Sequence, residues 1–144
     1  LPTVVVRPGK PNKAASSFAS GILREPLAGQ PSVCPVKPDL GLWIASPRAV
    51  TAALVHALET PAALWAPWRT INLSGLTVTV EEMVAALGRA GGDVDLIAWK
   101  RDPAIEAIVE TWPARFITPR ADAMGFTRDV NIDAILQAYK EDDM

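Results

Sequence analysis

The chain has 144 residues, of which 49% are hydrophobic and 21% charged, and its net charge is -2. That length and apolar content suit one ordinary domain with a core and exclude a disordered chain. The scattered basic residues leave no footprint for nucleic acid, and no run of about 18 apolar residues offers a membrane span. A single cysteine, Cys34, and a single histidine, His56, exclude an internal disulfide and a Cys/His zinc site, and favour a reducing, cytoplasmic compartment.

The first third of the chain predicts two strands, one helix and a long irregular crossing. The β-branched run over residues 3–6 predicts a strand of a covered parallel sheet, which Arg7-Pro8-Gly9 ends. Residues 14–25 predict a helix with one apolar face and one lightly charged polar face. Four prolines within residues 26–40 predict an irregular crossing, and residues 41–45 then predict a short strand.

Ser46 and Pro47 are a strong start signal for a second helix. A serine N-cap accepts a hydrogen bond from an exposed backbone N–H, and proline at the first helical position lacks only a donor that has no partner there. Thr60-Pro61 ends this helix. Its apolar stripe predicts the buried face and consists of Val50, Ala53, Leu54, Ala57 and Leu58.

The next segment predicts a strand followed by a capped helix. A Trp-rich loop leads into an apolar strand over residues 70–73. Thr79 and Glu82 have the spacing of a capping box, in which each side chain bonds the other residue's backbone N–H. The helix that they open ends before Gly91-Gly92, and its inward residues are Val80, Met83, Val84 and Leu87.

The last third predicts a strand and three helices. Residues 94–99 predict the strand, residues 103–112 and 119–124 predict two helices, and Asn131 caps the last one. The inner face of that helix consists of Ile132, Ile135, Leu136 and Tyr139. Strands that alternate with helices indicate an α/β fold.

Reactive side chains are scarce. His56 has no identifiable orienting partner, so it is expected to be solvated, and Cys34 and Tyr139 are expected to be a buried inert thiol and a core residue. Gly9 stands alone and Gly91-Gly92 follows a helix, so no Gly-rich phosphate loop joins a strand to a helix. By itself, the chain is expected to bind no dinucleotide tightly and to catalyse nothing.

The order of four segments resembles the C-terminal half of the extended short-chain dehydrogenases/reductases, the NAD-dependent epimerase/dehydratase family. The segments are "LPTVVVRPG", "LWIASPRAVTAALVHALE", "TINLSGLTVTVEEMVAAL" and "RADAMGFTRDVNIDAILQAYKED". The resemblance covers essentially the whole chain. It implies the last strands of a Rossmann-type parallel sheet plus the small substrate-binding subdomain.

The same resemblance explains why a core strand begins at the first residues. It implies that residues 1–144 are the C-terminal substrate-binding portion of a longer protein. The dinucleotide-binding half, with the Gly-rich turn for NAD and the Tyr-x-x-x-Lys pair for proton transfer, is then expected to precede them. NAD would be bound mainly by that half.

Within the family, the segment "RPGKPNKAASSFASGILREPLAGQ" resembles the D-erythronate-oxidising dehydrogenases most closely. The resemblance implies an NAD-dependent oxidoreductase that acts on a small sugar acid. A nucleotide-sugar or sugar epimerase/dehydratase is the alternative within the family. Those epimerases usually carry an arginine where this chain has Leu42, which argues against a nucleotide-diphosphate substrate.

Candidate ligands for such a substrate and cofactor lie after the first strand. The turn at Pro8, Gly9 and Lys10 would meet the nicotinamide, because ligands of open α/β sheets bind at the carboxyl ends of the strands. A sugar acid needs a cation with forked donors and neutral hydrogen-bonding groups. The candidates for those roles are Asn12, Ser16, Ser17, Arg24 and Arg48.

An interpretation of a different functional class remains open. The chain could be a non-catalytic binding module that reuses the fold, which a preceding Rossmann segment in the same reading frame would exclude. For the full-length protein, the expected partners are a small sugar-acid substrate and further copies in a homo-oligomer.

Overall fold

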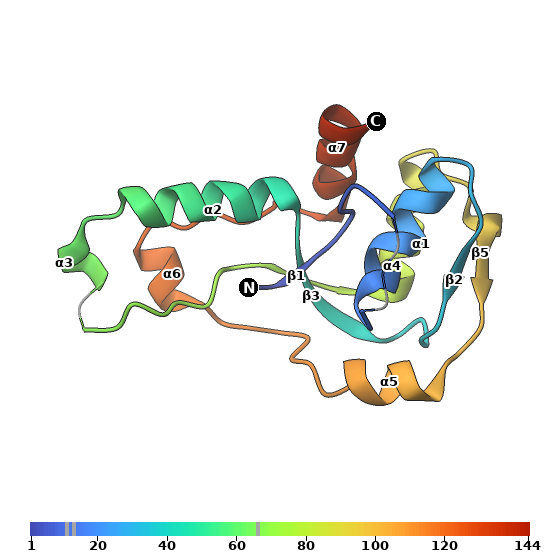
Figure 1. The fold of residues 1–144 in the computed structure, drawn as a ribbon, viewed down its shortest axis with the longest axis horizontal. Helices are drawn as coiled ribbons and strands as arrows, with labels where there is room; N and C mark the ends of the chain where they lie inside the picture. The colour runs from blue at the N-terminus through green and yellow to red at the C-terminus, as the bar shows by residue number, and fades with distance from the viewer. Residues whose placement is uncertain (11, 13, 66) are drawn as a thin grey trace.

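The computed structural model describes residues 1–10, 12, 14–65 and 67–144. It is a mixed α/β structure, as the sequence predicts, and it divides into two regions (Figure 1). We call α2, α3, α6 and residues 67–74 the arm, and the remaining elements the body. The elements of the body are β1 (Thr3–Val4), α1 (Ser17–Leu27), β2 (Ser32–Cys34), β3 (Gly41–Ala45), β4 (Leu76–Thr79), α4 (Val80–Arg89), the 3-10 turn η1 (Val94–Leu96), β5 (Ile97–Trp99), α5 (Pro103–Val109) and α7 (Ile132–Asp143).

A sheet in the order β1-β3-β4 forms the centre of the described residues. β1 pairs with β3 in parallel, with Thr3 opposite Ile44, and β3 pairs with β4 in antiparallel. Leu42, Trp43, Ile44 and Ala45 of β3 are all buried, because other elements cover both faces of this middle strand. The predicted strand over residues 3–6 continues past β1 as buried chain, but the positive φ of Val6 (55°) ends the ladder there.

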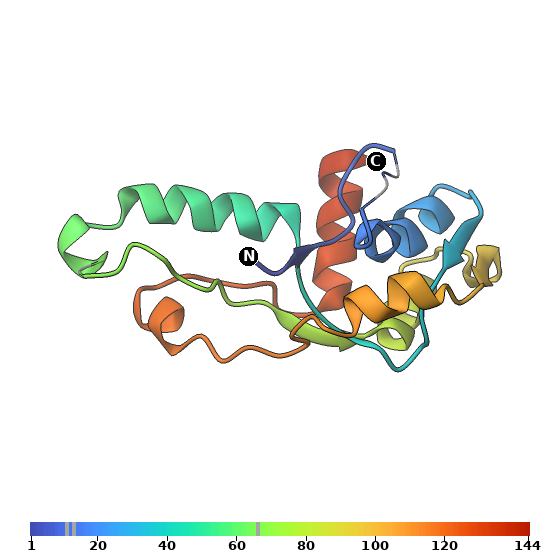
Figure 2. The ribbon, with the colours of Figure 1, turned by 60° about the horizontal axis from the view of Figure 1, so that its bottom comes forward.

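Helices α1, α4 and α7 close the core of the body over the sheet (Figure 2). The capping box at Thr79 is confirmed: its Oγ1 accepts from Glu82 N at 3.2 Å, and Glu82 Oε2 accepts from Thr79 N at 2.7 Å. Asn131 likewise caps α7 by accepting from Ala134 N at 2.8 Å. The side chains that these two helices bury include Val80, Met83, Leu87, Ile132, Ile135 and Leu136, as predicted.

Three sequence predictions about strands need correction. Residues 70–73 form no strand, because the register of β3 selects Leu76–Thr79 as its partner and Leu73 packs in the arm instead. The crossing over residues 26–40 contains β2, which finds a parallel partner in the distant β5. The strand predicted over residues 94–99 is shortened to β5, because Asp93 accepts from Asp95 N and caps a 3-10 turn.

The helices also shift relative to their predicted bounds. α1 begins at Ser17 and runs through Pro26, which its last turn accommodates, rather than spanning residues 14–25. Its predicted polar face is partly internal, because Ser20 and Arg24 are both buried. α5 ends at Val109, three residues before its predicted end.

The arm consists of α2 (Pro47–Glu59), α3 (Ala62–Trp65), α6 (Pro119–Ala123) and residues 67–74. Ser46 caps α2 as predicted, accepting from Ala49 N at 2.9 Å. The prediction that its apolar stripe is inward is confirmed only in part: within α2, all of whose residues are described, Ala53 is buried and Ala57 packs against the same cluster. Leu54 and Leu58 are 55% and 87% exposed, because α6 covers one narrow strip of the helix.

His56 is not the solvated side chain that the sequence predicts. It is half-buried in the arm, with Nε2 2.8 Å from the carbonyl oxygen of Met124 and its ring packed edge-on against Phe126. Cys34 and Tyr139 do pack in or against the core, as predicted. His56 therefore helps to hold α6 against α2.

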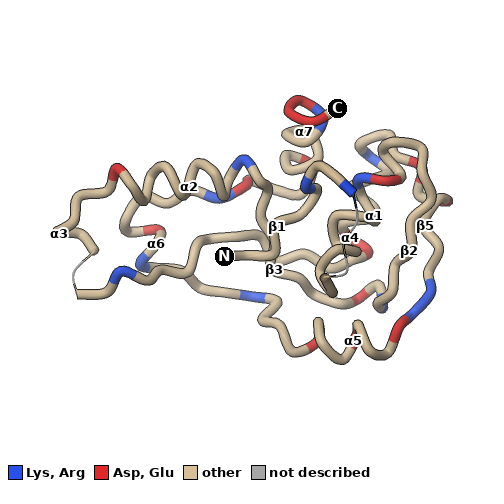
Figure 3. The backbone as a smooth tube through the Cα atoms, viewed as in Figure 1, with Lys and Arg blue, Asp and Glu red and all other residues tan. Residues whose placement is uncertain are grey.

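Charges of both signs are interspersed along the chain (Figure 3). Acidic residues gather most visibly at the C-terminal end of α7. Among the described residues, no helix has the length and apolar character needed to cross a membrane.

Candidate functional site

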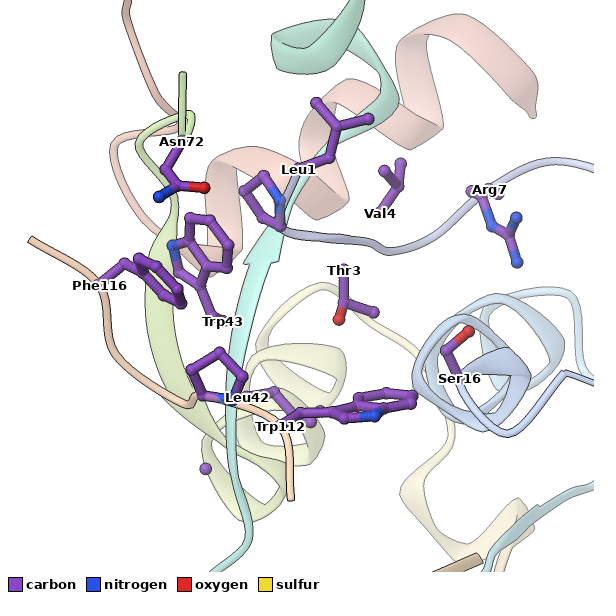
Figure 4. Close-up of a pocket in the computed structure, with 13 residues that line it drawn as sticks. Leu1, Thr3, Val4, Arg7, Ser16, Leu42, Trp43, Asn72, Trp112 and Phe116 are labelled. Carbon is purple, nitrogen blue, oxygen red and sulfur yellow. The ribbon is translucent and has the colours of Figure 1, made fainter. Parts of the chain in front are cut away.

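A pocket of about 450 Å³ opens beside β1 and the N-terminal end of α1 (Figure 4). Segments from five parts of the sequence line it: β1 with the residues around it, the start of α1, β3, the stretch before β4 that carries Asn72, and the stretch that follows α5. Its lining residues are Leu1, Pro2, Thr3, Val4, Arg7, Ser16, Gly41, Leu42, Trp43, Asn72, Trp112, Pro113 and Phe116.

One side of the pocket is an apolar wall. The rings of Trp43 and Phe116 stack with their centroids 4.3 Å apart, and Leu42 and Trp112 extend the apolar surface. Gly75 is required behind this wall, because a Cβ there would lie 2.6 Å from Trp43 Nε1. A wall of this kind excludes water from one face of a bound ligand.

The other side of the pocket is polar. Arg7 and Ser16 lie across from Trp43 and Phe116, and Thr3 lies between the two sides (Figure 4). The Arg7 side chain is exposed and bonds to no carboxylate among the described residues. A guanidinium presents forked donors that match a planar carboxylate. The pocket therefore combines one cation, neutral hydroxyls and an apolar wall, which suits a small hydroxylated acid.

The turn over Pro8, Gly9 and Lys10 follows directly at the carboxyl end of the first strand segment. Gly9 has a φ of +97°, which the other residue types adopt only with strain, and a Cβ at this position would meet nothing within 4 Å. The turn is thus exposed backbone with open space around it.

The structure separates the predicted substrate residues into four places. Ser16 lines the pocket beside Arg7. Asn12 and Ser17 line a different and larger groove, of about 1000 Å³, between α1, β2 and α5. Both are also used locally: Asn12 Oδ1 accepts from Ala14 N at 2.9 Å, and Ser17 Oγ accepts from Asn12 N at 3.1 Å.

The two predicted arginines make contacts within the protein. Arg24 is buried, where it bonds to the carbonyl oxygen of Arg7 at 2.6 Å and to the carboxylate of Glu25. Arg48 lies at the start of α2 and bonds to Asp142 and Glu141 at the end of α7. Neither arginine is among the residues that line the pocket.

Arg7, Thr3, Asn72 and the aromatic wall are the lining residues that sequence reasoning did not single out. Arg7 had a usable signal, since it stands at the carboxyl end of a predicted parallel strand. Asn72 and Phe116 had none, because they come from irregular segments that only tertiary packing brings to the pocket (Figure 4).

Other titratable groups of the body serve the fold. Burial raises the pKa of the Cys34 thiol, and burial also raises the pKa of the Tyr139 hydroxyl, so both stay protonated at neutral pH. Among the described residues, no group of three or more His, Cys, Asp and Glu side chains could hold a metal ion.

Comparison with known proteins identifies relatives in sequence. No family model matches the chain. It is 50% identical over 144 residues to a D-erythronate dehydrogenase of Cupriavidus necator, covering 99% of this chain and 44% of the relative. It is 47% identical over 146 residues to a D-erythronate dehydrogenase of Haemophilus influenzae, covering 100% of this chain and 46% of the relative. The chain thus spans less than half the length of these relatives.

Solved structures agree on the fold. A protein of Agrobacterium tumefaciens described as a nucleoside-diphosphate-sugar epimerase matches with a TM-score of 0.95 and 40% identity, over 99% of this chain and 42% of its own. The L-threonine dehydrogenase of Phytophthora infestans matches with a TM-score of 0.81, over 96% of this chain and 44% of its own. At 21% identity, this second likeness shows the fold alone.

Proposed function

We propose that residues 1–144 form the substrate-binding portion of an NAD-dependent dehydrogenase. The proposal proceeds from the match in sequence and fold between this chain and the C-terminal part of the extended short-chain dehydrogenases/reductases. The substrate of the proposed dehydrogenase is a small sugar acid of the D-erythronate type. The observation that carries the proposal is the 50% identity to a D-erythronate dehydrogenase over 99% of this chain. The pocket beside Arg7 supports it.

The pocket has the groups that a sugar acid requires. Arg7 would bind the carboxylate through two parallel N–H donors. Ser16 and Thr3 would bind the hydroxyls, since a hydroxyl side chain both donates and accepts. The stacked pair of Trp43 and Phe116 would cover the carbon chain. A volume of about 450 Å³ lies within the ordinary range of small-molecule sites.

The cofactor would lie against the turn at Pro8, Gly9 and Lys10. When bound, NAD would supply the acceptor for the hydride that leaves the carbinol carbon, while the hydroxyl proton would pass to a base. The contribution of this chain would be to orient the substrate and to offer exposed backbone to the carboxamide. The base would belong to a preceding portion of the protein.

The free edge of β1 supports such a preceding portion. β1 pairs only with β3 within the described residues, so its other edge is open. An open strand edge can pair with a further strand, because its N–H and C=O groups have no partner there. The activity, NAD binding and any homo-oligomer would then be properties of the complete gene product.

The likeness to a nucleoside-diphosphate-sugar epimerase favours a second candidate, a nucleotide-sugar substrate. Leu42 argues against a nucleotide-sugar substrate. Its side chain lies at the pocket, is 2% exposed, and supplies no charge where the resemblance places a diphosphate-binding arginine. A buried leucine cannot compensate a diphosphate, whereas it suits a ligand with a short carbon chain.

The test uses the complete gene product that contains residues 1–144. Its intact mass is measured first, and a mass of 15.4 kDa would contradict the proposal and leave a binding module. The reduction of NAD is then followed with D-erythronate and with nucleotide sugars. We expect turnover of the sugar acid alone.

Arg7→Met is the variant that probes carboxylate binding. Loss of a charge-assisted pair predicts a rise in the KM for D-erythronate of about 10- to 100-fold. Arg69→Met is the matched control, because Arg69 is an exposed arginine of the arm that does not line the pocket. Equal kinetics for the two variants would contradict the assignment of Arg7.

A further inference from the structure

The chain leaves the first strand through a strained residue. Val6 has a φ of +55°, in the left-handed region that a β-branched side chain rarely adopts, and its side chain is fully buried. The residue that follows is Arg7, whose side chain lines the pocket. A conformation of this kind persists only where surrounding contacts enforce it.

Those contacts come from α1 and hold both backbone groups of Arg7. Arg7 N donates to Ser20 Oγ at 3.5 Å, and the Arg7 carbonyl oxygen accepts from Arg24 Nη1 at 2.6 Å. Ser20 and Arg24 are four residues apart, so they lie one above the other on the same helix face. Both are buried, at 2% and 8% exposure. One face of α1 therefore fixes the peptide units on either side of the Arg7 Cα.

The Arg24 side chain is itself held in place. Its second terminal nitrogen bonds to Oε1 of Glu25, and the two side chains are 10% and 17% exposed. The other oxygen, Glu25 Oε2, is buried and has no hydrogen-bond partner among the described residues. A buried ion pair with an unsatisfied oxygen contributes little net stability, because the desolvation of its charges offsets their attraction. The pair is better explained by the orientation that it gives to the guanidinium.

We propose that Arg24, assisted by Ser20, is a positioning residue for Arg7 in the substrate site. By fixing the Arg7 peptide units, the two side chains direct the Arg7 guanidinium to the pocket and set the turn that follows. This inference rests on the proposed function, in which Arg7 binds the substrate carboxylate. In this proposal Arg24 contacts the backbone of Arg7 and does not contact the substrate.

The test compares Arg24→Lys, Ser20→Ala and Arg89→Lys in the complete gene product. A lysine keeps a cation beside Glu25, which protects the fold, but its compact ammonium cannot present the two-pronged donor geometry that spans Glu25 and the Arg7 carbonyl. Arg89 is the matched control, because it also binds a carboxylate, that of Asp133, with two nitrogens at 2.8 and 2.9 Å, far along the chain from Arg7.

Two measurements are made on each variant. The first is hydrogen exchange of the peptide that carries residues 3–10, compared with peptides from α4 and α7. The second is the kinetics with D-erythronate, resolved into KM and kcat. For Arg24→Lys we expect faster exchange confined to residues 6–10 and a KM for the sugar acid raised about tenfold, the effect of one lost charge-assisted bond, with kcat near the wild-type value. Ser20→Ala should give a smaller change in the same direction, and Arg89→Lys should change neither.

The outcomes separate this inference from the proposed function. Unchanged exchange at residues 6–10 in Arg24→Lys would overturn the positioning role, and so would an unchanged KM in an active enzyme. A wild-type protein that does not oxidise the sugar acid would overturn the proposed function. In that case the exchange data alone decide whether Arg24 and Ser20 hold Arg7.

Discussion

The body and the arm both use helices with clear apolar stripes, yet they bury them to different extents. In the body, α4 and α7 cover the sheet, and their stripes are almost entirely inside. In the arm, α2 is longer than α4, but Ala53 is the only buried residue of α2, all of whose residues are described. Among the described residues, the core cluster of the body has 21 buried members and that of the arm has five.

This difference between the two regions shows that an apolar stripe on a helix predicts a covered face but does not identify the element that covers it. The exposed part of the α2 stripe, with Leu54 and Leu58, has the same periodicity as the buried stripe of α4. The arm also carries Leu64 and Trp68 at 58% and 70% exposure. The body should therefore hold most of the stability of this chain, and the arm should open first.

The largest effect is expected from Leu136→Ala in α7. Leu136 is fully buried in the core of the body, so its truncation should lower the free energy of unfolding by about 2–5 kcal/mol, measured by urea denaturation. Leu58→Ala on α2 removes the same atoms from an exposed site and should change the free energy of unfolding by less than about 0.5 kcal/mol. Similar losses in both variants would abolish the distinction between the two regions.

Phe126→Ala tests whether the arm opens by itself. Phe126 packs edge-on against His56 and Trp65, with ring centroids 4.7 and 6.1 Å away, and so joins α6 to α2 and α3. Its loss should lower the local opening free energy of the arm by about 2 kcal/mol, less than a full core deletion because a small cluster can collapse. Hydrogen exchange should then accelerate in α2 and α6 and stay unchanged in α4. Equal acceleration everywhere would show one cooperative unit.

Asp129→Asn tests the joint between the arm and the body. The Asp129 carboxylate accepts from Ser46 N at 2.8 Å and from Ser46 Oγ at 2.7 Å, just where α2 leaves β3. An amide can accept on one side only, so the change should cost about 1–2 kcal/mol in thermal unfolding. The exposed Asp143→Asn is the control and should be nearly neutral. An equally small effect for Asp129→Asn would mean that this joint contributes little.

The smallest effect is a pH-dependent one at the contact between α2 and α7. Arg48 bonds to the carboxylates of Asp142 and Glu141. Its hydrogen bond lowers the pKa of Asp142, and the pKa of Glu141 is lowered first by a hydrogen bond from Gln137 and then by the one from Arg48. A lowered pKa in the folded state adds stability above the unfolded values, about 3.9 and 4.3, and that stability disappears as the pH falls through the lowered values.

The measurement is the thermal midpoint of the wild type and of Arg48→Met as a function of pH. At neutral pH the thermal midpoint of the wild type should be slightly higher than that of Arg48→Met. This difference between the two midpoints should vanish in strong acid and shrink with added salt. A difference that grows as the pH falls would contradict this role of Arg48.

Local signals in the sequence predicted the starts of helices well. Ser46, Thr79 and Asn131 each accept from a backbone N–H three residues ahead, so everything that decides the cap lies within one turn. Strands were predicted less well. β2 depends on β5, more than sixty residues away, and β4 depends on the register of β3, which no local pattern encodes.

The candidate site shows the same division. Ser16 was among the predicted substrate ligands and does line the pocket. Ser17 faces another groove, because one residue along a helix turns a side chain by about 100°, and Asn12, which precedes the helix, lines that same groove. Whether any of these residues binds substrate stays a prediction until the kinetics are measured.

The sequence by itself determined the α/β class, the capped helix starts and the family resemblance, because each rests on a short pattern or on the order of such patterns. Tertiary structure decided which apolar stripes are covered, which segments pair as strands, and which arginine reaches the pocket. Arg7 and Arg24 are chemically alike, but only packing could bury Arg24 against the Arg7 carbonyl and leave the Arg7 guanidinium exposed at the pocket. The physical reason is that burial and pairing depend on residues far apart in sequence, whereas a cap or a stripe depends only on its near neighbours.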